Sequence, residues 1–366
     1  MPLKYHEQMD RDNTLKLRGL LQELPTFCRC FFRAIEPRTS SRTRIAYAYD
    51  LRVFFQFLAD SVPELSGKPI EKFVLSDIAG LPVLRLEEYM EYLKYRVREQ
   101  EELPEERASG RKGKGKGKIE ILNHERSIKR KISSLKSFYK YLYRDQLISE
   151  DTASLLILPK LRDREIIRLD ENEVADLLDT AESGEKLTER QQRFHEKTAL
   201  RDTAILSLML GTGIRVSECV GLNIQDLDLN SDGIRIHRKG GKEVTVYFSD
   251  EVERILSSYL KARKKMPALS GSEDALFLSL QKKRIGVRAV ENMVKKYASA
   301  VTPLKHITPH KLRSTYGTNL YRETGDIYLV ADVLGHEDVN TTKKHYAALE
   351  EERRRSARNR VHLRED

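Results

Sequence analysis

The segment GIRIHRKGGKEVTVYF, residues 233–248, is the part of the sequence that decides the fold class. Apolar and polar side chains alternate on both sides of Gly240-Gly241, which is the pattern of two half-buried strands joined by a tight turn. On either side of this segment, apolar residues recur at the three-to-four spacing that is typical of helices. The sequence therefore predicts a mainly helical chain with one small β-hairpin, and Lys239 lies at the tip of that hairpin.

Residues 1–158 are predicted to be helical throughout, with helices over 41–58, 84–98 and 127–143. Each has an apolar stripe, which we interpret as core rather than as a surface for stacking on bases. In the first helix the predicted stripe is Ile45, Tyr49, Val53, Phe54 and Leu58. In the third helix the predicted buried face is Ile128, Ile132, Leu135, Phe138, Tyr139 and Leu142.

The charged segment 159–169 is predicted to be a linker between two domains. Pro159 ends the preceding helix, and Asp170 opens the next one in a capping-box pattern with Glu173. The sequence thus predicts a helical domain over 1–158 and a mostly helical α+β domain over 170–348, which contains the hairpin. A charged tail, also expected to be helical, follows over 349–366.

An unusual insertion, LPEERASGRKGKGKGKIEILN, occupies residues 103–123 between the second and third helices. Glycine alternates with cations there, so the run can bury little and suits contact with phosphates. Its candidate DNA-binding residues are Arg111, Lys112, Lys114, Lys116 and Lys118. Further candidates on the third helix are Lys129, Arg130 and Lys136. The alternative is that the insertion is a solvated spacer.

Composition points to an intracellular protein with a polyanionic partner. The chain has 366 residues and a net charge of +10, which fits nucleic acid but is weak support by itself. The three cysteines, Cys28, Cys30 and Cys219, have no metal-ligand spacing, so free thiols and a cytosolic setting are expected. No apolar run is long enough for a membrane span, and no signal peptide is apparent.

Four further motifs carry chemically useful side chains. They are GTGIRVSE (211–218), TPHKLR (308–313), LGHED (334–338) and TTKKHY (341–346). Together with the hairpin they supply, in chain order, Arg215, Lys239, His310, Arg313, His336 and Tyr346. Arginines can neutralise a phosphodiester, lysine and histidine can transfer protons, and a tyrosine can form a covalent phosphate ester. This set suits phosphoryl transfer to a phenol without a metal.

The local patterns agree with these roles. Thr308 and Pro309 are typical of an N-cap and a first helical residue, which would place His310 and Arg313 on one helix face. Glu218 follows Arg215 by one helical turn. It either orients a neighbouring cation or forms an ordinary helix salt bridge. His345 competes with His336 for the role of general acid, and we favour His336.

The order and context of these residues resemble the tyrosine site-specific recombinases of the phage integrase family. The insertion and the stretch LTERQQRFHEKTALRD, residues 187–202, are most similar to the XerS-type Xer recombinases. The resemblance implies an N-terminal core-binding domain that grips DNA and a C-terminal catalytic domain. It also implies that Tyr346 is the nucleophile, that Arg215, Lys239, His310, Arg313 and His336 are catalytic, and that Glu218 supports them.

The activity implied by this resemblance is DNA strand exchange through a 3′-phosphotyrosyl intermediate. A homotetramer would act on paired sites in double-stranded DNA without metal, cofactor, ATP or small-molecule substrate. We expect a bacterial cytoplasmic protein associated with the nucleoid, acting in chromosome-dimer resolution or in mobile-element integration and excision. The alternatives are strand relaxation of the type IB topoisomerase kind and a DNA-binding architectural or regulatory protein without catalysis.

Overall fold

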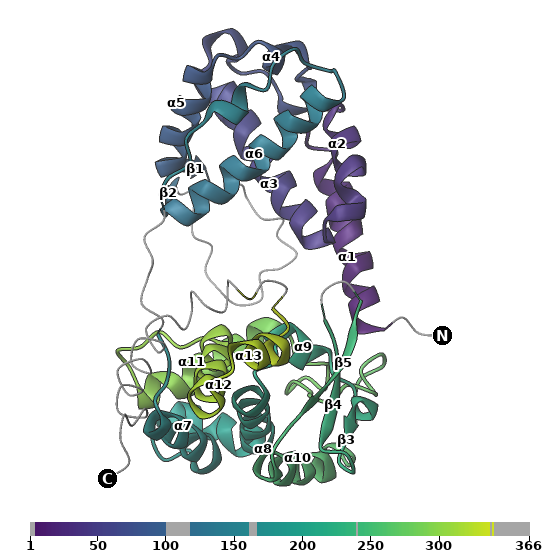
Figure 1. The fold of residues 1–366 in the computed structure, drawn as a ribbon, viewed down its shortest axis with the longest axis vertical. Coiled ribbons are helices and arrows are strands. Elements are labelled where there is room, and N and C mark those ends of the chain that lie inside the picture. The colour runs from purple at the N-terminus through teal and green to yellow at the C-terminus, as the bar shows by residue number, and fades with distance from the viewer. Residues whose placement is uncertain (1–3, 100–117, 161–166, 239–240, 337–338, 340–366) are drawn as a thin grey trace, which may run out of the picture. The chain divides into compact units, whose positions relative to one another are not determined.

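The structure is a computed structural model, and it describes residues 4–99, 118–160, 167–238, 241–336 and 339. The chain divides into two compact units, Met1–Asp163 and Arg164–Asp366, shown in Figure 1. The fold is mainly helical with a small antiparallel sheet, which confirms the predicted fold class.

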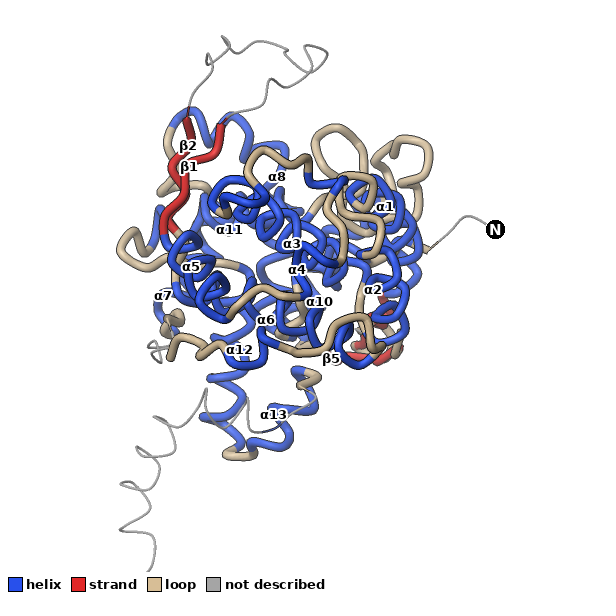
Figure 2. Tube along the Cα trace, turned by 90° about the horizontal axis from the view of Figure 1, so that it is seen from above, coloured by secondary structure: helices blue, strands red, loops and turns tan. Residues whose placement is uncertain are grey.

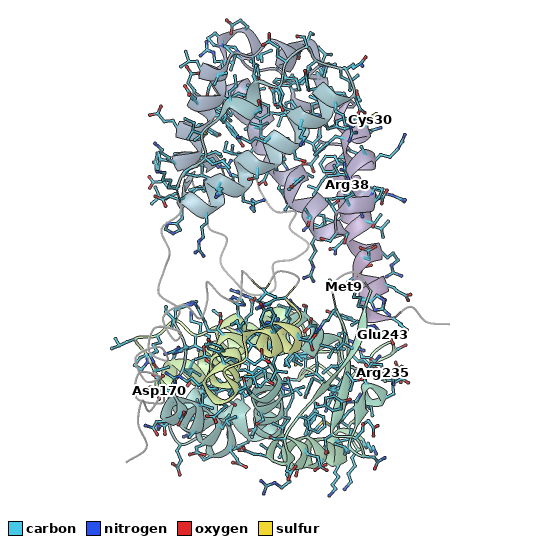
Figure 3. The ribbon with its side chains drawn as sticks, viewed as in Figure 1. Met9, Cys30, Arg38, Asp170, Arg235 and Glu243 are labelled. Atoms are coloured by element: carbon cyan, nitrogen blue, oxygen red, sulfur yellow. The ribbon has the colours of Figure 1, made fainter. Side chains whose placement is uncertain are left out.

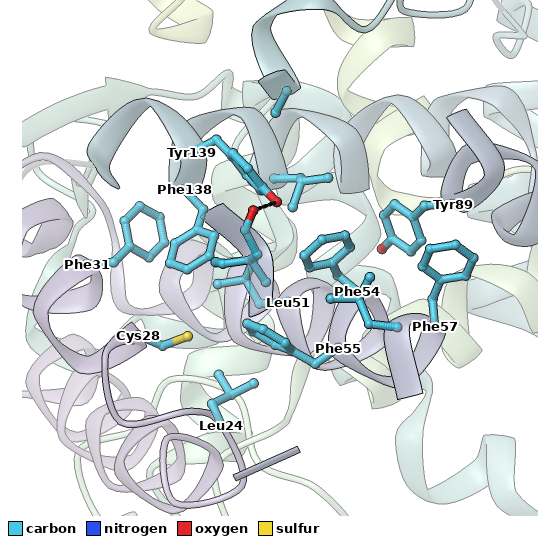
Figure 4. Close-up of a cluster of buried hydrophobic side chains, with 14 of the residues drawn as sticks. Leu24, Cys28, Phe31, Leu51, Phe54, Phe55, Phe57, Tyr89, Phe138 and Tyr139 are labelled. Atoms are coloured by element: carbon cyan, nitrogen blue, oxygen red, sulfur yellow. Dashed lines mark hydrogen bonds between the residues drawn. The ribbon is translucent and has the colours of Figure 1, made fainter. Parts of the chain in front are cut away.

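The first unit is a helical bundle around an aromatic core. Its helices are α1 (Tyr5–Leu20), α2 (Cys28–Ile35), α3 (Ser41–Ser61), α4 (Ser76–Ala79), α5 (Val83–Lys94) and α6 (Glu125–Arg144). Figure 4 shows the centre of this core, where Phe54 packs edge-to-face on Tyr89 and the Tyr139 hydroxyl donates to the Ile78 carbonyl at 3.2 Å. The aromatic side chains drawn there are buried, which confirms that these side chains form core rather than a surface for stacking on bases.

The buried face of α6 is as predicted, but that of α3 is rotated. All six predicted α6 residues are buried. On α3, Tyr49 is 42% exposed and Ile45 and Val53 are only partly buried. The core is instead contacted by a face that includes Ala48, Leu51, Phe54, Phe55 and Leu58. Helix α3 packs against both α1 and α6, so two faces of this helix are available for apolar residues and the sequence alone does not identify the right one.

The prediction that residues 1–158 contain helices only is wrong. The expected helix over 84–98 ends at Lys94, and strand β1 (Tyr95–Glu99) follows it. Strand β1 pairs in antiparallel register with β2 (Lys118–Leu122), and Figure 2 shows the two strands side by side. The insertion therefore contains one strand, β2, of a two-stranded ribbon that lies between α5 and α6 in the sequence. The segment 100–117, with most of the basic run, lies outside the described residues.

The second unit is built around the long helix α8. Its helices are α7 (Glu171–Ser183), α8 (Glu189–Thr212), α9 (Val216–Gly221), α10 (Asp250–Arg263), α11 (Val287–Val301), α12 (Pro309–Thr324) and α13 (Ile327–Leu334). Asp170 and Glu173 form the predicted capping box, and α8 contacts α7, α10 and α12. Leu169, the last residue of the predicted linker, is buried in this unit and donates its N–H to Thr315.

The predicted hairpin is present and belongs to a three-stranded antiparallel sheet. Strands β4 (Gly233–His237) and β5 (Glu243–Tyr247) pair so that His237 lies opposite Glu243. The short strand β3 (Leu227–Asp228), which the sequence does not predict, adds to the outer edge of β4. Ile234 and Ile236 of β4 and Val246 of β5 are buried, as the alternating pattern requires. One face of the hairpin thus packs on the second unit.

Two general expectations can be compared with the described residues. None of their helices has both the length and the apolar character needed to cross a membrane. Cys28, Cys30 and Cys219 are all free thiols. Burial raises the pKa of Cys219 to about 12, so this thiol stays protonated and acts as a small apolar side chain.

Candidate active site

Arg215 lies at the N-terminal end of α9, where a buried carboxylate holds it. Helix α8 ends at Gly213, whose φ of +64° allows the sharp turn into α9. Glu218, at the third position of α9, accepts the Arg215 N–H at 2.7 Å and its Nη1 at 2.9 Å. The Glu218 side chain is 4% exposed, whereas that of Arg215 is 38% exposed. The two interpretations of Glu218 therefore coincide, because the helix salt bridge is also what orients Arg215.

Arg313 is buried between two helix ends. Helix α12 begins at Pro309, as predicted, although the Thr308 side chain makes no capping hydrogen bond. Arg313 donates from Nη1 to the Gly213 carbonyl at 2.6 Å and from Nη2 to the Leu334 carbonyl. Both acceptors lie at helix C-termini, where the helix dipole favours a cation. His310, one turn earlier on α12, is exposed.

The C-terminal end of α13 is where the predicted residues meet. Gly335 has a φ of +61°, its N–H donates to Asp332 and the His336 N–H donates to Ala331. These two bonds form a Schellman motif, which ends the helix and sets the path of the backbone into His336. His336 itself is partly buried.

Three guanidinium groups bind four consecutive carbonyls at this helix end. Arg313 binds the Leu334 carbonyl, and Arg215 binds the Gly335 carbonyl from Nη2 at 3.2 Å. Arg238, from the end of the hairpin, binds the Asp332 and Val333 carbonyls at 3.2 and 2.6 Å. No sequence pattern singles out Arg238, because its acceptors are backbone atoms more than 90 residues away. Arg215, Arg313 and His336 are thus brought to one place.

The two remaining predicted catalytic residues, Lys239 and Tyr346, lie outside the described residues. The neck of the hairpin next to Lys239 is described. There the Arg238 N–H donates to the Lys242 carbonyl at 2.8 Å, and His237 Nδ1 lies 3.3 Å from Glu243 Oε1. Figure 3 labels Glu243 on this neck.

Two other tyrosines of the second unit have structural positions. Tyr316 packs so closely on Gly213 that a Cβ there would lie 2.5 Å from its ring, and burial raises the pKa of Tyr316. Tyr321 belongs to a small apolar cluster with Ile327 and Leu334. A raised pKa makes the phenolate, which is the attacking form, harder to generate. Neither environment favours a nucleophile.

Some candidate DNA-binding cations of the first unit have protein partners. Arg130 Nη2 donates to the buried Asp50 at 2.6 Å, and Lys131 lies 3.7 Å from the same carboxylate. Burial raises the pKa of Asp50, and Arg130 opposes this shift. Lys136 donates to the Ser154 and Leu156 carbonyls at 3.2 and 2.8 Å. The candidates Arg111, Lys112, Lys114 and Lys116 lie outside the described residues, and Lys118 opens β2.

Arg130 and Lys131 line a polar cavity of about 620 Å³ in the first unit. The cavity is also lined by Arg52 and Arg96, which no sequence pattern singles out. The acidic residues that line it are Asp50 and Asp60. Among the described residues, no group of three or more His, Cys, Asp and Glu side chains is placed to hold a metal ion.

Residues 167–353, which are more than half of the chain, match the model of the phage integrase family. The chain belongs to the phage integrase family. As a member, it is a tyrosine recombinase, an enzyme that cleaves and rejoins DNA strands by site-specific recombination through a covalent tyrosine intermediate. The two alternatives, a topoisomerase and a non-catalytic architectural protein, are not supported by these comparisons.

Curated relatives of this integrase-family chain are Xer proteins. The tyrosine recombinase XerC of Caldanaerobacter subterraneus subsp. tengcongensis is 34% identical over 337 residues, which cover 90% of this chain and 83% of the relative. The tyrosine recombinase XerD of Oceanobacillus iheyensis is 33% identical over 219 residues, covering 59% of this chain and 69% of that protein.

Solved structures share the fold of this integrase-family chain at low sequence identity. The XerH recombinase bound to a palindromic difH substrate, in a post-cleavage complex, has a TM-score of 0.62 and 16% identity, and the match covers 95% of this chain and 88% of XerH. The Tn1549 transposon integrase in complex with transposon right end DNA has a TM-score of 0.59 and 18% identity, covering 91% and 99% of the two chains.

Proposed function

We propose that Tyr346 is the nucleophile of the recombination reaction. Its phenolic oxygen attacks a DNA phosphodiester, the P–O bond to the 5′-oxygen breaks, and a 3′-phosphotyrosyl ester forms with a free 5′-hydroxyl. The phenol loses its proton and the leaving oxygen gains one. The 5′-hydroxyl of a partner strand then attacks the ester and releases Tyr346, so the phosphoryl bond is conserved and no ATP is needed.

Arg215 and Arg313 are proposed to bind the two non-bridging oxygens of that phosphate. The observation that carries this proposal is the meeting of both guanidinium groups at the end of α13, next to His336. A guanidinium suits a phosphate because it can donate two parallel hydrogen bonds, and it stabilises the extra charge of the transition state. Glu218 holds Arg215 for this task.

Proton transfer is assigned to Lys239, His310 and His336. Lys239 falls in the sequence between the strands β4 and β5, and the sequence pattern predicts it at the hairpin tip, from which a flexible side chain could reach the leaving oxygen. His310 is exposed one turn before Arg313 on α12, and His336 directly follows the Schellman turn. An imidazole has the pKa range that general acid–base catalysis requires.

Assembly and cellular role are proposed from the same chemistry. Strand exchange needs two duplex sites with two active chains on each, so a homotetramer on double-stranded DNA is the proposed assembly. We propose a bacterial cytoplasmic enzyme associated with the nucleoid. Its role is chromosome partition through dimer resolution, or integration and excision of a mobile element. The relatives include Xer recombinases, and one structural neighbour is a transposon integrase, so both roles have support.

Replacing Tyr346 by Phe tests the nucleophile. A DNA substrate with a nick beside the cleavage point traps the covalent intermediate, because the short strand diffuses away and cannot rejoin. Wild type should give a protein–DNA adduct in a denaturing gel. Tyr346→Phe removes one oxygen only, so we expect DNA binding to survive and the adduct to disappear.

The matched controls are Tyr316→Phe and Tyr321→Phe, which should still form the adduct because both residues serve packing. An adduct formed by Tyr346→Phe, or its loss in Tyr316→Phe with intact binding, would show that another tyrosine is the nucleophile.

A further inference from the structure

We propose that Arg238 is a positioning residue that holds the end of α13, and with it His336, at a fixed spacing from the hairpin that carries Lys239. The inference deepens the proposed function, since it rests on the proton-transfer roles of Lys239 and His336. It concerns a residue that is predicted to touch neither the phosphate nor the reacting oxygens.

Arg238 contacts the hairpin through its backbone and the end of α13 through its side chain. Its backbone closes the hairpin neck, where its N–H donates to the Lys242 carbonyl and its carbonyl accepts the Gly241 N–H at 3.2 Å. Its side chain donates from Nη1 and Nη2 to the Asp332 and Val333 carbonyls in the last turn of α13. A single residue therefore joins two elements that are more than 90 residues apart in sequence.

The contact between Arg238 and α13 suits a planar guanidinium. The two acceptors are successive carbonyls, and a guanidinium offers two donors at a matching fixed spacing, which an ammonium does not. The negative end of the helix dipole adds to the attraction. The Arg238 Nε is buried without an acceptor among the described residues, so the two terminal nitrogens make the contact.

Gly335 leaves room for this guanidinium. A Cβ at Gly335 would lie 2.6 Å from Arg238 Cζ and 2.8 Å from its Nε. The side chain therefore lies flat against the turn that leads into His336. The Arg238 side chain therefore links the position of that turn to the position of the hairpin neck.

The consequence concerns two proposed proton-transfer groups, each next in the chain to one end of the Arg238 contact. Lys239 is bonded directly to Arg238, and His336 follows Gly335. Protonation of the leaving 5′-oxygen requires the acid within hydrogen-bond reach. A displacement of about 1 Å in such a group can cost on the order of 100-fold in rate. Loss of Arg238 should therefore slow leaving-group departure rather than DNA binding.

The test compares an all-oxygen nicked substrate with one whose 5′-bridging oxygen is sulfur, in single-turnover cleavage by the full chain at saturating protein. A thiolate leaves without a proton, so a defect in proton delivery disappears with sulfur. We expect Arg238→Met and Arg238→Lys to lose about 10- to 100-fold on oxygen and to recover on sulfur. Lys239→Ala should behave in the same way. The matched control is Arg235→Met, an exposed arginine on β4, the strand that leads into Arg238 (Figure 3).

Equal losses of Arg238→Met on both substrates, while Lys239→Ala recovers on sulfur, would overturn the inference. So would weaker DNA binding with normal cleavage of bound DNA, which would make Arg238 a phosphate contact. A failure of Lys239→Ala to recover would instead overturn the proposed role of Lys239.

Amide hydrogen exchange tests the role of Arg238 independently of the cleavage reaction. The Gly335 and His336 amides donate to Asp332 and Ala331, and they should exchange faster in Arg238→Met than in Arg235→Met. Equal exchange in the two variants would mean that Arg238 does not hold the end of α13, and the inference would be wrong.

Discussion

Arg215 and Arg313 have one proposed role but lie in different surroundings. Their types and order can be predicted from the motifs, because phosphate recognition needs guanidinium groups in either case. The burial of these two side chains cannot be predicted from the motifs. The Arg313 acceptors, at Gly213 and Leu334, lie 100 and 21 residues away, so only the tertiary structure brings them together. Arg313 is thus a packing element of the second unit as well as a proposed catalytic group.

Replacing Arg313 by Met should therefore destabilise the protein more than replacing Arg215 by Met. The Arg313 change leaves two buried carbonyls without their donors, at about 1 to 3 kcal/mol each, so we expect a loss of roughly 2 to 6 kcal/mol in the free energy of unfolding. Arg215→Met removes the guanidinium from the Gly335 carbonyl and from the buried Glu218 carboxylate. Glu218 keeps the backbone N–H of residue 215 as a donor, so a smaller loss of about 1 to 3 kcal/mol is expected. Urea unfolding followed by circular dichroism measures both, and equal losses would contradict the buried role of Arg313.

At the scale of elements, the sequence predicts secondary structure that depends on local patterns, but it does not predict strands that pair with distant segments. The hairpin at 233–248 is predicted correctly because its strands are joined by a tight turn and pair with each other. Strand β1 is missed because its sequence, YRVRE, directly continues a helix and its partner β2 lies at the end of the insertion, after most of the basic run. A strand whose partner is distant in the sequence has no local pattern that indicates pairing. The preceding helix has a clear apolar pattern, so the helix prediction is extended over the strand.

Gly335→Ala tests how tightly α13 is joined to the hairpin. Alanine at a φ of +61° costs about 1 to 2 kcal/mol in backbone strain, and its Cβ would also overlap the Arg238 guanidinium. We expect a larger loss of unfolding free energy than for Gly271→Ala, together with loss of cleavage. Gly271 is the matched control because its φ is +82° and a Cβ added there would have nothing within 4 Å. Equal losses in thermal or urea unfolding would mean that the Arg238 contact adds no constraint.

At the scale of the whole molecule, the net charge of +10 predicts a polyanionic partner but not where that partner is bound. The structure shows that two of the α6 cations predicted to bind DNA also bind groups of the protein itself. Arg130 and Lys136 already have protein acceptors, so their charge is partly committed to the fold. Most of the basic run of the insertion lies outside the described residues, so its role stays a prediction.

Removing the basic run tests that role. The deletion should span 110–117, because Lys118 pairs with Glu99 in the β1–β2 ribbon and is best kept. Loss of Arg111, Lys112, Lys114 and Lys116 should weaken DNA binding and lower the slope of log K against log salt by up to about 3.6. Cleavage by protein already bound to DNA should stay near the wild-type rate.

The control for that deletion replaces the same four cations by Gln and keeps the length. Both variants should show the same change in slope when binding is measured at several salt concentrations. An unchanged slope in both would identify the run as a solvated spacer. A change in the deletion alone would assign the effect to length rather than charge.

The end of α13 offers backbone carbonyls, not side chains, to its three arginines. Substitution at Asp332 or Val333 cannot delete these acceptors, because every residue type carries the same carbonyl group. Tolerance to mutation should therefore be one-sided, with variation permitted at Asp332 and Val333 and restricted at the distant arginines that donate to this helix end. A directed-evolution library aimed only at Asp332 and Val333 would leave the junction in place, and one that reached Arg215, Arg238 or Arg313 would not.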